Sequence, residues 1–350
     1  MARKQVTMGD VAKEMGISIV TVSKALAGKE GVSEGLRELI ILKARELGYE
    51  YSAGRKITDA VNVTIGIVIS ERFVGDNENS FYFKIYQKML MGLSAKGYIG
   101  ILEIIRPEDE NGGVLPNMLR MDSVSQVVVI GEMGTAFLEK LVASPVSVIF
   151  FDFENEEFDV DSITGDNVNG GFLLTRYLAQ KGHENIGFVG SYHSTRSILD
   201  RFMGYRKYLI AKDKEYISEW TIPDRDEGGH YVELKLPEHM PTAFVCNCDE
   251  VAYAMIDRLS KAGYRVPEDI SVVGYDGYAK RIPENVSLTT YRVDSAEMVR
   301  CCIHIIEQRV KNKYYRRGMT VIRGELVERG TVKDADGGNA GNGGNAGNER

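Results

Sequence analysis

Two kinds of hydrophobic pattern divide this chain of 350 residues. In the first fifty residues, apolar side chains recur at helical spacing in short segments that glycines separate. From residue 62 onward, short apolar runs rich in Val, Ile and Phe alternate with longer amphipathic stretches. The first pattern predicts a small all-α domain, and the second predicts an α/β body.

The amino-terminal segments carry helix start and stop signals. Thr7 can cap a first helix, and Asp10 adds a carboxylate where the helix dipole favours negative charge. Gly16 can take the left-handed conformation that ends this helix. Ser18 and Ser33 can cap a second and a third helix in the same way. The inward faces are expected to be made by Val11, Ala12 and Met15, by Val22, Ala25 and Leu26, and by Leu36, Leu39, Ile40, Lys43 and Leu47.

The turn between the first two helices has three residues, which lets the helices cross steeply, as in a helix-turn-helix. Residues 1–58 hold 10 Lys and Arg against 7 Asp and Glu, whereas the rest of the chain holds 33 against 43. A cationic head on an anionic body is typical of a protein that contacts phosphates with one end. The charge distribution therefore favours nucleic-acid binding by the head.

Eight apolar runs in the body are short enough to be buried strands. They are VTIGIVIS, YIGILEII, SQVVVIGE, VSVIFFD, SITGDN, NIGFVG, TAFVCNCD and ISVVGYD. The stretches between them predict helices, among them FYFKIYQKMLMGLSAKG, GGFLLTRYLAQKG, ILDRFMGYRKYLIAKD, EVAYAMIDRLSKAG and AEMVRCCIHIIEQRVK. This alternation predicts parallel sheets with helices on both faces.

Acidic residues end three of these runs. Asp152, Asp249 and Asp276 follow apolar runs directly, and ligands of parallel sheets collect at the carboxyl ends of strands. Asp at such a position also serves as a turn former or a helix cap. The three residues are candidates for ligand binding, and both interpretations stay open.

The head resembles a known family. The runs VTMGDVAKEMGIS, TVSKAL, GVSEGLRELI and ARELGY are similar to the DNA-binding domain of lactose-repressor and galactose-repressor (LacI/GalR) type transcriptional regulators. The resemblance assigns residues 1–50 to this domain. It implies phosphate contacts by Thr7, Ser18, Thr21, Ser23, Ser33 and Tyr49, and base contacts in the major groove by Ile19, Val20 and Lys24.

Two features depart from the family pattern. Ile19 and Val20 could press against thymine methyl groups but could not bond a purine edge, and they could instead pack locally. The hinge, residues 51–61, lacks the usual Pro-Asn start and the leucine that wedges into the minor groove. Arg55, Lys56 and Ile57 are the DNA-contact candidates there, either in a hinge helix or in a flexible basic linker.

The body resembles the effector-binding core of the same family, which is itself similar to two-lobed periplasmic sugar-binding proteins. The runs KGHENIGFVG, SILDRFMGYRKYL, AFVCNCDEVAYAMIDRLSKAGYRVPEDISVVGYDG and SLTTYRVD carry this likeness. It implies a two-lobed effector-binding and dimerisation domain over 62–330, with lobe crossovers near 164, 292 and 323. The effector-binding residues that it implies are Tyr82, Asp152, Arg201, Trp220, Asp249 and Asp276.

A sugar suits such residues, because carboxylates and a guanidinium pair with neighbouring hydroxyls while an aromatic ring covers the apolar face of a pyranose. A nucleobase stacked on Trp220 or Tyr82 is a second possibility, and ordinary packing is an alternative role for Trp220. Cys248 stands where the family commonly has Asn, which alters the set of hydrogen-bonding groups.

Other signals narrow the function. The chain has five His and no GxxxxGK[ST] motif, which argues against an enzyme, and its four cysteines lack zinc spacing, so we expect neither a metal nor a cofactor. No apolar run reaches the roughly 20 residues that cross a bilayer, and no signal peptide is evident, so we expect a cytoplasmic protein. The Gly/Asn-rich residues 331–350 should form a disordered tail.

The resemblance implies a homodimeric repressor that binds a pseudo-palindromic double-stranded operator and whose affinity for it is controlled by a small-molecule effector, most simply a sugar. The alternative is a sugar-binding sensor whose operator binding is weakened or lost.

Overall fold

The computed structural model describes residues 6–26, 31–47, 63–74, 81–121, 124–277, 287–311 and 315–335. The chain divides into two compact units. The first comprises Met1–Thr64 with Ser94–Ile99, and the second comprises Ile65–Leu93 with Gly100–Arg350.

Three helices form the first unit: α1 (Met8–Met15), α2 (Ile19–Leu26) and α3 (Glu34–Glu46). The predicted cap is confirmed, because Thr7 and Asp10 form a capping box, and Gly16 is left-handed with a φ of 64°. Their core contains Val11, Ala12, Val22, Ala25, Leu26, Ile40 and Ala44. Leu39 was expected in this core but is 58% exposed, because the four-residue spacing of Ile40 and Ala44 turns position 39 away.

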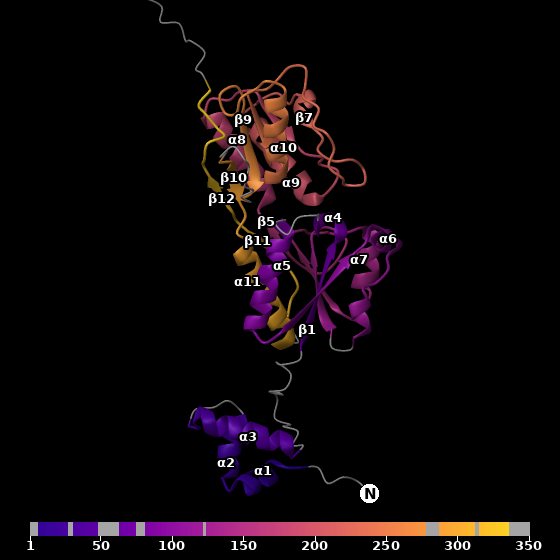
Figure 1. The fold of residues 1–350 in the computed structure, drawn as a ribbon, viewed down its shortest axis with the longest axis vertical. Helices are drawn as coiled ribbons and strands as arrows, with labels where there is room; N and C mark the ends of the chain where they lie inside the picture. Colours follow the sequence, from indigo (N-terminus) through magenta and orange to yellow (C-terminus); the bar gives the residue numbers. More distant parts are fainter. Residues whose placement is uncertain are drawn as a thin grey trace, which may run out of the picture. The chain divides into compact units, whose positions relative to one another are not determined.

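The second unit has two lobes, each built on a six-stranded sheet. The first lobe has the strand order β11-β5-β4-β3-β1-β2. Its strands are β1 (Thr64–Ser70), β2 (Ile99–Ile105), β3 (Val124–Ile130), β4 (Ser147–Phe151), β5 (Asp161–Gly165) and β11 (Met319–Ile322). Helices α5 (Phe81–Ala95) and α11 (Ser295–Lys311) cover one face, and α7 (Thr135–Val142) covers the other (Figure 1). Shorter helices are α4 (Glu71–Val74), α6 (Pro107–Gly112) and the 3-10 turn η1 (Asn117–Arg120).

The second lobe has the order β12-β10-β9-β8-β6-β7. Its strands are β6 (Ile186–Val189), β7 (Thr221–Ile222), β8 (Ala243–Cys246), β9 (Ser271–Asp276), β10 (Thr289–Arg292) and β12 (Glu325–Val327). Helix α10 (Asp249–Lys261) packs on Phe244 and Val272, whereas α9 (Arg196–Ala211) packs on Phe188, which points to the opposite face. Helix α8 (Asn167–Gln180) lies against α9, and the 3-10 turn η2 (Ser218–Trp220) precedes β7.

The eight strands predicted from apolar runs are all present, and both sheets contain parallel strand pairs as predicted, with an exception at one edge of the second sheet. There β12 pairs antiparallel to β10, with Tyr291 opposite Leu326. The chain passes between the lobes three times, after β5, after β10 and after β11. These passages lie beside the predicted crossover positions 164, 292 and 323.

The prediction that the tail begins at residue 331 needs a correction. Thr331 is fully buried, and its hydroxyl donates to the carbonyl of Val272 at 2.6 Å. The backbone nitrogen of Ala335 donates to the carbonyl of Lys181 at 2.7 Å. Residues 331–335 are therefore held on the second lobe by hydrogen bonds, and the remainder of the expected tail lies outside the described residues. No described helix is both long and apolar enough to cross a bilayer.

Candidate functional site

The exposed side of α2 carries the residues predicted to reach base edges. Ile19 and Val20 occupy its first two positions and are 55% and 63% exposed, and Lys24 is also exposed. The two aliphatic side chains therefore do not pack into the core of the first unit. Exposed large apolar side chains next to one another are typical of a contact surface.

Hydroxyl groups at the starts of α1 and α2 serve as helix caps. The Ser18 hydroxyl accepts from the backbone nitrogen of Thr21 at 3.0 Å. The Thr7 hydroxyl donates to the Asp10 carboxylate at 2.6 Å and accepts from the Asp10 backbone nitrogen at 3.3 Å. A phosphate contact by Thr7 would require this proton to turn away from Asp10, whereas the cap itself fixes the orientation of α1.

The other predicted DNA contacts divide into two groups. Thr21 and Ser23 are half-buried on α2, and Ser33 is exposed before α3. The remaining predicted contacts lie outside the described residues, together with the hinge at 51–61; they are Tyr49, Arg55, Lys56 and Ile57.

In the second unit, Arg201 on α9 is the centre of a buried polar cluster. Its Nε donates to Oδ1 of Asn167 at 2.9 Å, and its Nη1 donates to the backbone carbonyl of Asn247 at 2.7 Å. The same Nη1 lies 3.4 Å from Oδ1 of Asp276. The guanidinium carbon lies 3.8 Å from the ring centre of Tyr275. These contacts fix both the position and the plane of the guanidinium group.

Glycines on α8 and α9 allow this arrangement. A Cβ on Gly171 would collide with the backbone of Arg201, and a Cβ on Gly204 would collide with the backbone of Val168. The two helices therefore cross in direct backbone contact, which brings Asn167 at the start of α8 to Arg201. The glycines of α8 and α9 are therefore as necessary to the position of Arg201 as its polar partners are.

Two carboxylates from different lobes meet near Arg201. Asp152 follows β4 of the first lobe, and Asp276 ends β9 of the second lobe. The Tyr82 hydroxyl on α5 donates to Oδ2 of Asp152 at 3.0 Å. The φ angles of Asp152 and Asp276 are 68° and 108°, in the left-handed region that costs non-glycine residues of order 1–3 kcal/mol. Strained backbone at two carboxylates that share one cation is typical of a binding site.

Burial governs the protonation of these acids. It raises the pKa of Asp276 to about 7, although the charge of Arg201 opposes the rise. It also raises the pKa of Asp152, against the charge of Arg201 and the hydrogen bond from Tyr82. One guanidinium thus lies near a buried carboxylate, Asp152, and a half-buried one, Asp276, and the cluster offers both acceptors and a proton to a ligand near neutral pH.

Two of the six predicted effector residues have other partners. Trp220 is buried, and its indole nitrogen donates to the carbonyl of His239 at 2.7 Å, so it packs within the second lobe. Asp249 is buried at the start of α10, where its Oδ1 accepts from the Thr290 hydroxyl at 2.6 Å. The structure therefore assembles Tyr82, Asp152, Arg201 and Asp276, but gives Trp220 and Asp249 roles in the interior of the second lobe.

Three members of the cluster were not identified from the sequence: Asn167, Asn247 and Tyr275. Asn167 and Asn247 lie at or near the carboxyl ends of two predicted strands, and Tyr275 immediately precedes Asp276. Their position at the carboxyl ends of strands was the available signal. The sequence analysis considered only acidic residues at strand ends and therefore did not include these uncharged ones.

Three of the four cysteines are buried free thiols. Cys246, Cys248 and Cys302 are buried, and burial raises the pKa of the Cys248 thiol to about 12. Such thiols are protonated and unreactive at neutral pH. Within the described residues, no group of three or more His, Cys, Asp or Glu could hold a metal ion.

Comparison with known proteins addresses both units. The model of the lacI family of bacterial regulatory proteins matches residues 7–52, and a periplasmic binding protein-like domain matches residues 175–332. The HTH-type transcriptional repressor PurR of Vibrio cholerae is 26% identical over 341 residues, which cover 94% of this chain and 98% of that repressor. The chain is therefore similar to lacI-family regulators over nearly its whole length.

Solved structures agree with the LacI-family fold. The lac repressor dimer bound to operator and the anti-inducer ONPF aligns with a TM-score of 0.65 and 22% identity, over 94% of this chain and 100% of that one. The transcriptional regulator CelR in complex with cellobiose aligns with a TM-score of 0.64 and 22% identity, over 93% and 100% of the two chains. The predicted fold class, a helix-turn-helix domain followed by a periplasmic-binding-protein-like α/β core, is confirmed. These similarities support a DNA-binding transcriptional regulator.

Proposed function

We propose that this protein is a regulator of the LacI family that binds a sugar between the lobes of its second unit, and that binding changes its affinity for an operator. The observation that carries this proposal is the position of Arg201 near two carboxylates, buried Asp152 of one lobe and half-buried Asp276 of the other. A ligand that contacts both carboxylates contacts both lobes. It would therefore favour the closed arrangement of the lobes over an open one.

The chemistry of the cluster suits a neutral polyhydroxy compound. Asp152 and Asp276 supply acceptors, Arg201 supplies donors in a fixed plane, and Tyr82 adds an aromatic ring next to Asp152. Neighbouring hydroxyls of a sugar ring match such paired donors and acceptors. CelR, one of the structural neighbours, is complexed with cellobiose, and a relative from Enterococcus faecium is complexed with ribose.

At the other end, we propose that the exposed side of α2 enters the major groove of the operator. Ile19 and Val20 would lie against thymine methyl groups, and Lys24 would donate to a base edge. Phosphate contacts are proposed for Thr7, Ser18, Thr21, Ser23, Ser33 and Tyr49, with Arg55, Lys56 and Ile57 contacting DNA from the hinge.

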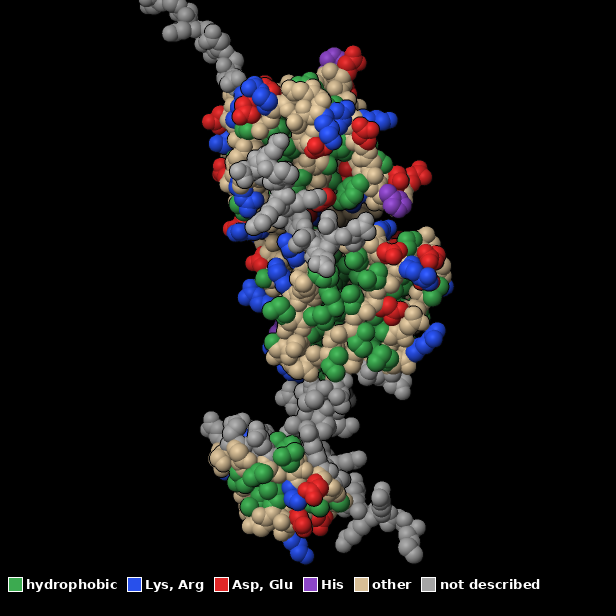
Figure 2. Space-filling view, viewed as in Figure 1, with side chains coloured by type: hydrophobic (Ala, Val, Ile, Leu, Met, Phe, Trp, Pro, Cys, Tyr) green, Lys and Arg blue, Asp and Glu red, His purple; other side chains and the backbone are tan. Residues whose placement is uncertain are grey.

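The working form is proposed to be a homodimer that pairs through the first lobes. Met91 on α5 is 73% exposed, Ile104 on β2 is also exposed, and Figure 2 shows hydrophobic side chains gathered on one face of this lobe. A pseudo-palindromic operator requires two recognition helices at a fixed spacing, which closure of the lobes would alter. Sedimentation of Met91→Glu against the unchanged protein tests the pairing.

The proposal is tested by thermal unfolding in a panel of neutral sugars, because a bound ligand raises the midpoint with the logarithm of its excess over its dissociation constant. A sugar that stabilises the protein should fail to stabilise Arg201→Lys and should still stabilise Arg176→Lys, since Arg176 is exposed on α8. Equal stabilisation of both variants would contradict binding at the cluster.

A further inference from the structure

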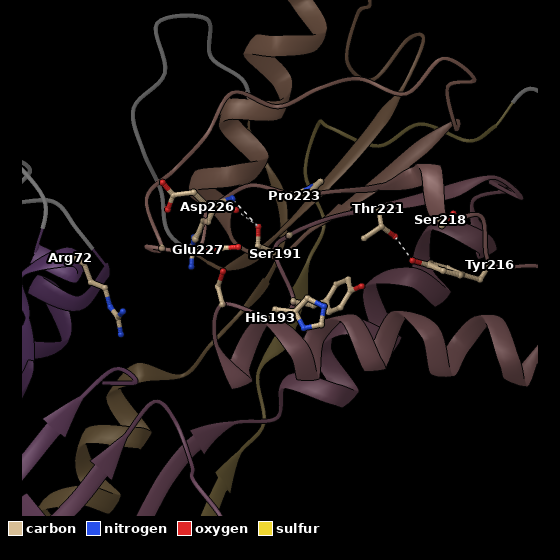
Figure 3. A pocket seen from close by; sticks show the side chains of 14 residues that line it. Arg72, Ser191, His193, Tyr216, Ser218, Thr221, Pro223, Asp226 and Glu227 are labelled. Atoms are coloured by element: carbon tan, nitrogen blue, oxygen red, sulfur yellow. Dashed lines mark hydrogen bonds between the residues drawn. The ribbon is translucent and has the colours of Figure 1, made fainter. Parts of the chain in front are cut away.

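The pocket that Figure 3 shows lies on the second lobe and is lined by Ser191, by residues 226–227 and by neighbouring segments. Buried Asp224 accepts from the backbone nitrogen of Ser191 at 2.6 Å and from Nδ2 of Asn247 at 3.0 Å. The carbonyl of Asn247 in turn accepts from Arg201. This pocket therefore adjoins the proposed effector site and receives no separate function. A different feature, the exposed start of α2 in the first unit, supports a further assignment.

The first two residues of α2 present only apolar side-chain atoms. Ile19 is 55% exposed and Val20 is 63% exposed, and neither side chain has a hydrogen-bond donor or acceptor. The hydroxyls on either side of them are engaged with each other, because Oγ of Ser18 lies 2.8 Å from Oγ1 of Thr21 and accepts from the Thr21 backbone nitrogen at 3.0 Å. A ligand at the start of α2 therefore meets an aliphatic surface made by two adjacent side chains.

Both side chains are held in place before any contact is made. Ile and Val are branched at Cβ and strongly prefer one χ1 rotamer in a helix. A Cβ on Gly9 of α1 would lie 3.8 Å from Cδ1 of Ile19, so the end of the Ile19 side chain lies against the first turn of α1. Exposed β-branched residues are less favourable in a helix than Ala, so these two residues do not serve the stability of α2. Their rigidity lowers the entropy cost of a contact with a ligand.

Base edges in the major groove offer one apolar group, the 5-methyl group of thymine. Aliphatic side chains that cover a purine edge would leave its acceptors without partners, which is costly. Cytosine lacks the methyl group, but 5-methylcytosine carries it at the same ring position. Ile19 and Val20 can contact this group, and they have no atom that distinguishes O4 of thymine from the amino group of 5-methylcytosine.

The exposed donor on α2 is Lys24, which lies one turn beyond Val20. A Cβ on Gly31 would lie 3.6 Å from Nζ of Lys24, so the ammonium group lies beside the segment that leads to α3. It would donate to a base pair other than the pair that Val20 covers. The choice between thymine and 5-methylcytosine is therefore left to the two aliphatic side chains.

We infer that α2 reads the 5-methyl groups of two neighbouring pyrimidines in each operator half-site and accepts 5-methylcytosine in place of thymine there. The inference rests on the proposed function, because it assumes that the exposed side of α2 enters the major groove. It adds a class of ligand, DNA that is methylated at C5 of cytosine. Where cytosine replaces thymine in a half-site, methylation of that cytosine should restore the affinity.

Fluorescence anisotropy of the full chain with a duplex operator selected from a random library tests the inference. Each thymine is replaced singly by deoxyuridine, which removes the methyl group and keeps the base pair. At every thymine that responds, cytosine and 5-methylcytosine opposite guanine are compared. Ile19→Ala and Val20→Ala are the test variants, and Ala at exposed helix positions preserves the helix. Leu39→Ala on α3 is the control, because Leu39 is a similarly exposed aliphatic residue.

Burial of one methyl group corresponds to about fourfold in affinity. We therefore expect deoxyuridine to weaken binding about fourfold at two neighbouring thymines of a half-site. The 5-methylcytosine duplex should bind within about twofold of the thymine duplex, and the cytosine duplex should bind at least as weakly as the deoxyuridine duplex. Ile19→Ala and Val20→Ala should each remove the penalty at one of these thymines, because the contact is already lost, and Leu39→Ala should keep both penalties.

A 5-methylcytosine duplex that binds as weakly as the cytosine duplex overturns the inference. So does the absence of any deoxyuridine penalty, or a penalty that Ile19→Ala and Val20→Ala leave unchanged at every thymine. In each of these cases specific binding of the selected operator preserves the proposed contact of the first unit with DNA. A selection that enriches no duplex overturns both the inference and that proposed contact.

Discussion

The guanidinium group of Arg201 lies over the ring of Tyr275, with 3.8 Å between its carbon and the ring centre. The ring supports one face of the planar cation and leaves its edge for hydrogen bonds to Asn167 and Asn247. A cation held in this way loses little freedom when a ligand binds, which lowers the cost of binding.

Gly170→Ala should disturb this support. A Cβ there would lie 2.5 Å from a ring carbon of Tyr275 and 2.8 Å from its hydroxyl oxygen, so the ring must move. We expect a loss of about 1–3 kcal/mol in the free energy of unfolding, with weaker effector binding. Urea unfolding measures the first effect. Gly318→Ala is the control, because a Cβ at Gly318 meets nothing within 4 Å, and an equal loss in both variants would contradict the role of Gly170.

Asp276→Asn should change how stability depends on pH. Folded Asp276 keeps its proton up to about pH 7, whereas an unfolded Asp loses it near pH 4. Between these values the native state binds more protons than the unfolded state, so the free energy of unfolding falls as pH rises. The wild type should therefore lose stability relative to Asp276→Asn between pH 5 and about pH 7.5.

Urea unfolding at both pH values checks this slope, with Asp269→Asn as the control. Arg265 lowers the pKa of Asp269 to about 2, so this carboxylate is ionised in both the folded and the unfolded state throughout the range. Its substitution should shift stability equally at the two pH values. A wild type that tracks Asp276→Asn at both values would show that Asp276 does not hold its proton.

Glu132→Gln should weaken closure of the lobes. Glu132 of the first lobe accepts from the backbone nitrogen of Arg196 at 2.7 Å and is ion-paired with its guanidinium, and Arg196 begins α9 of the second lobe. Loss of this charge should raise the dissociation constant of the effector severalfold by favouring the open form. Titration of Glu132→Gln beside Glu139→Gln, an exposed residue of α7, separates closure from general charge loss. Identical affinities in the two variants would show that the Glu132–Arg196 ion pair does not stabilise the closed form.

Val20→Ala should weaken binding to the specific operator by about tenfold and leave the salt dependence unchanged, since this side chain would touch bases and not phosphates. An operator selected from a random duplex library, titrated at several salt concentrations, provides the measurement. Leu39→Ala is a matched control, because Leu39 is an equally exposed aliphatic residue on α3. A comparable loss in Leu39→Ala would place recognition elsewhere.

Periodicity and caps predicted most of the fold. The strands that sequence reasoning did not identify are short or at sheet edges, such as β7 with two residues and β12 with three. Such strands contain too few residues to show alternation, and their pairing depends on the neighbouring strand. Residues 331–335 were assigned to the tail because their contacts on the second lobe come from distant parts of the chain.

The sequence predicted less of the site than of the fold. Asp249 and Asp276 both follow strands, yet Asp249 is bonded inside the lobe to Thr290 while Asp276 lies beside Arg201. The difference arises because Asp249 begins a helix, whereas Asp276 has a positive φ that turns its side chain toward Arg201. Trp220 was a candidate through the family resemblance, but its indole nitrogen donates to the carbonyl of His239 within the second lobe.

The central claim is that a ligand at Arg201 controls operator affinity. Fluorescence anisotropy of a labelled, selected operator tests it most directly, with the stabilising sugar present and absent, in the wild type and in Arg201→Lys. We expect the sugar to change wild-type operator affinity by at least about fivefold and to have no effect on Arg201→Lys, whose affinity without sugar stays within about twofold of wild type. A full response to sugar in Arg201→Lys would contradict the account.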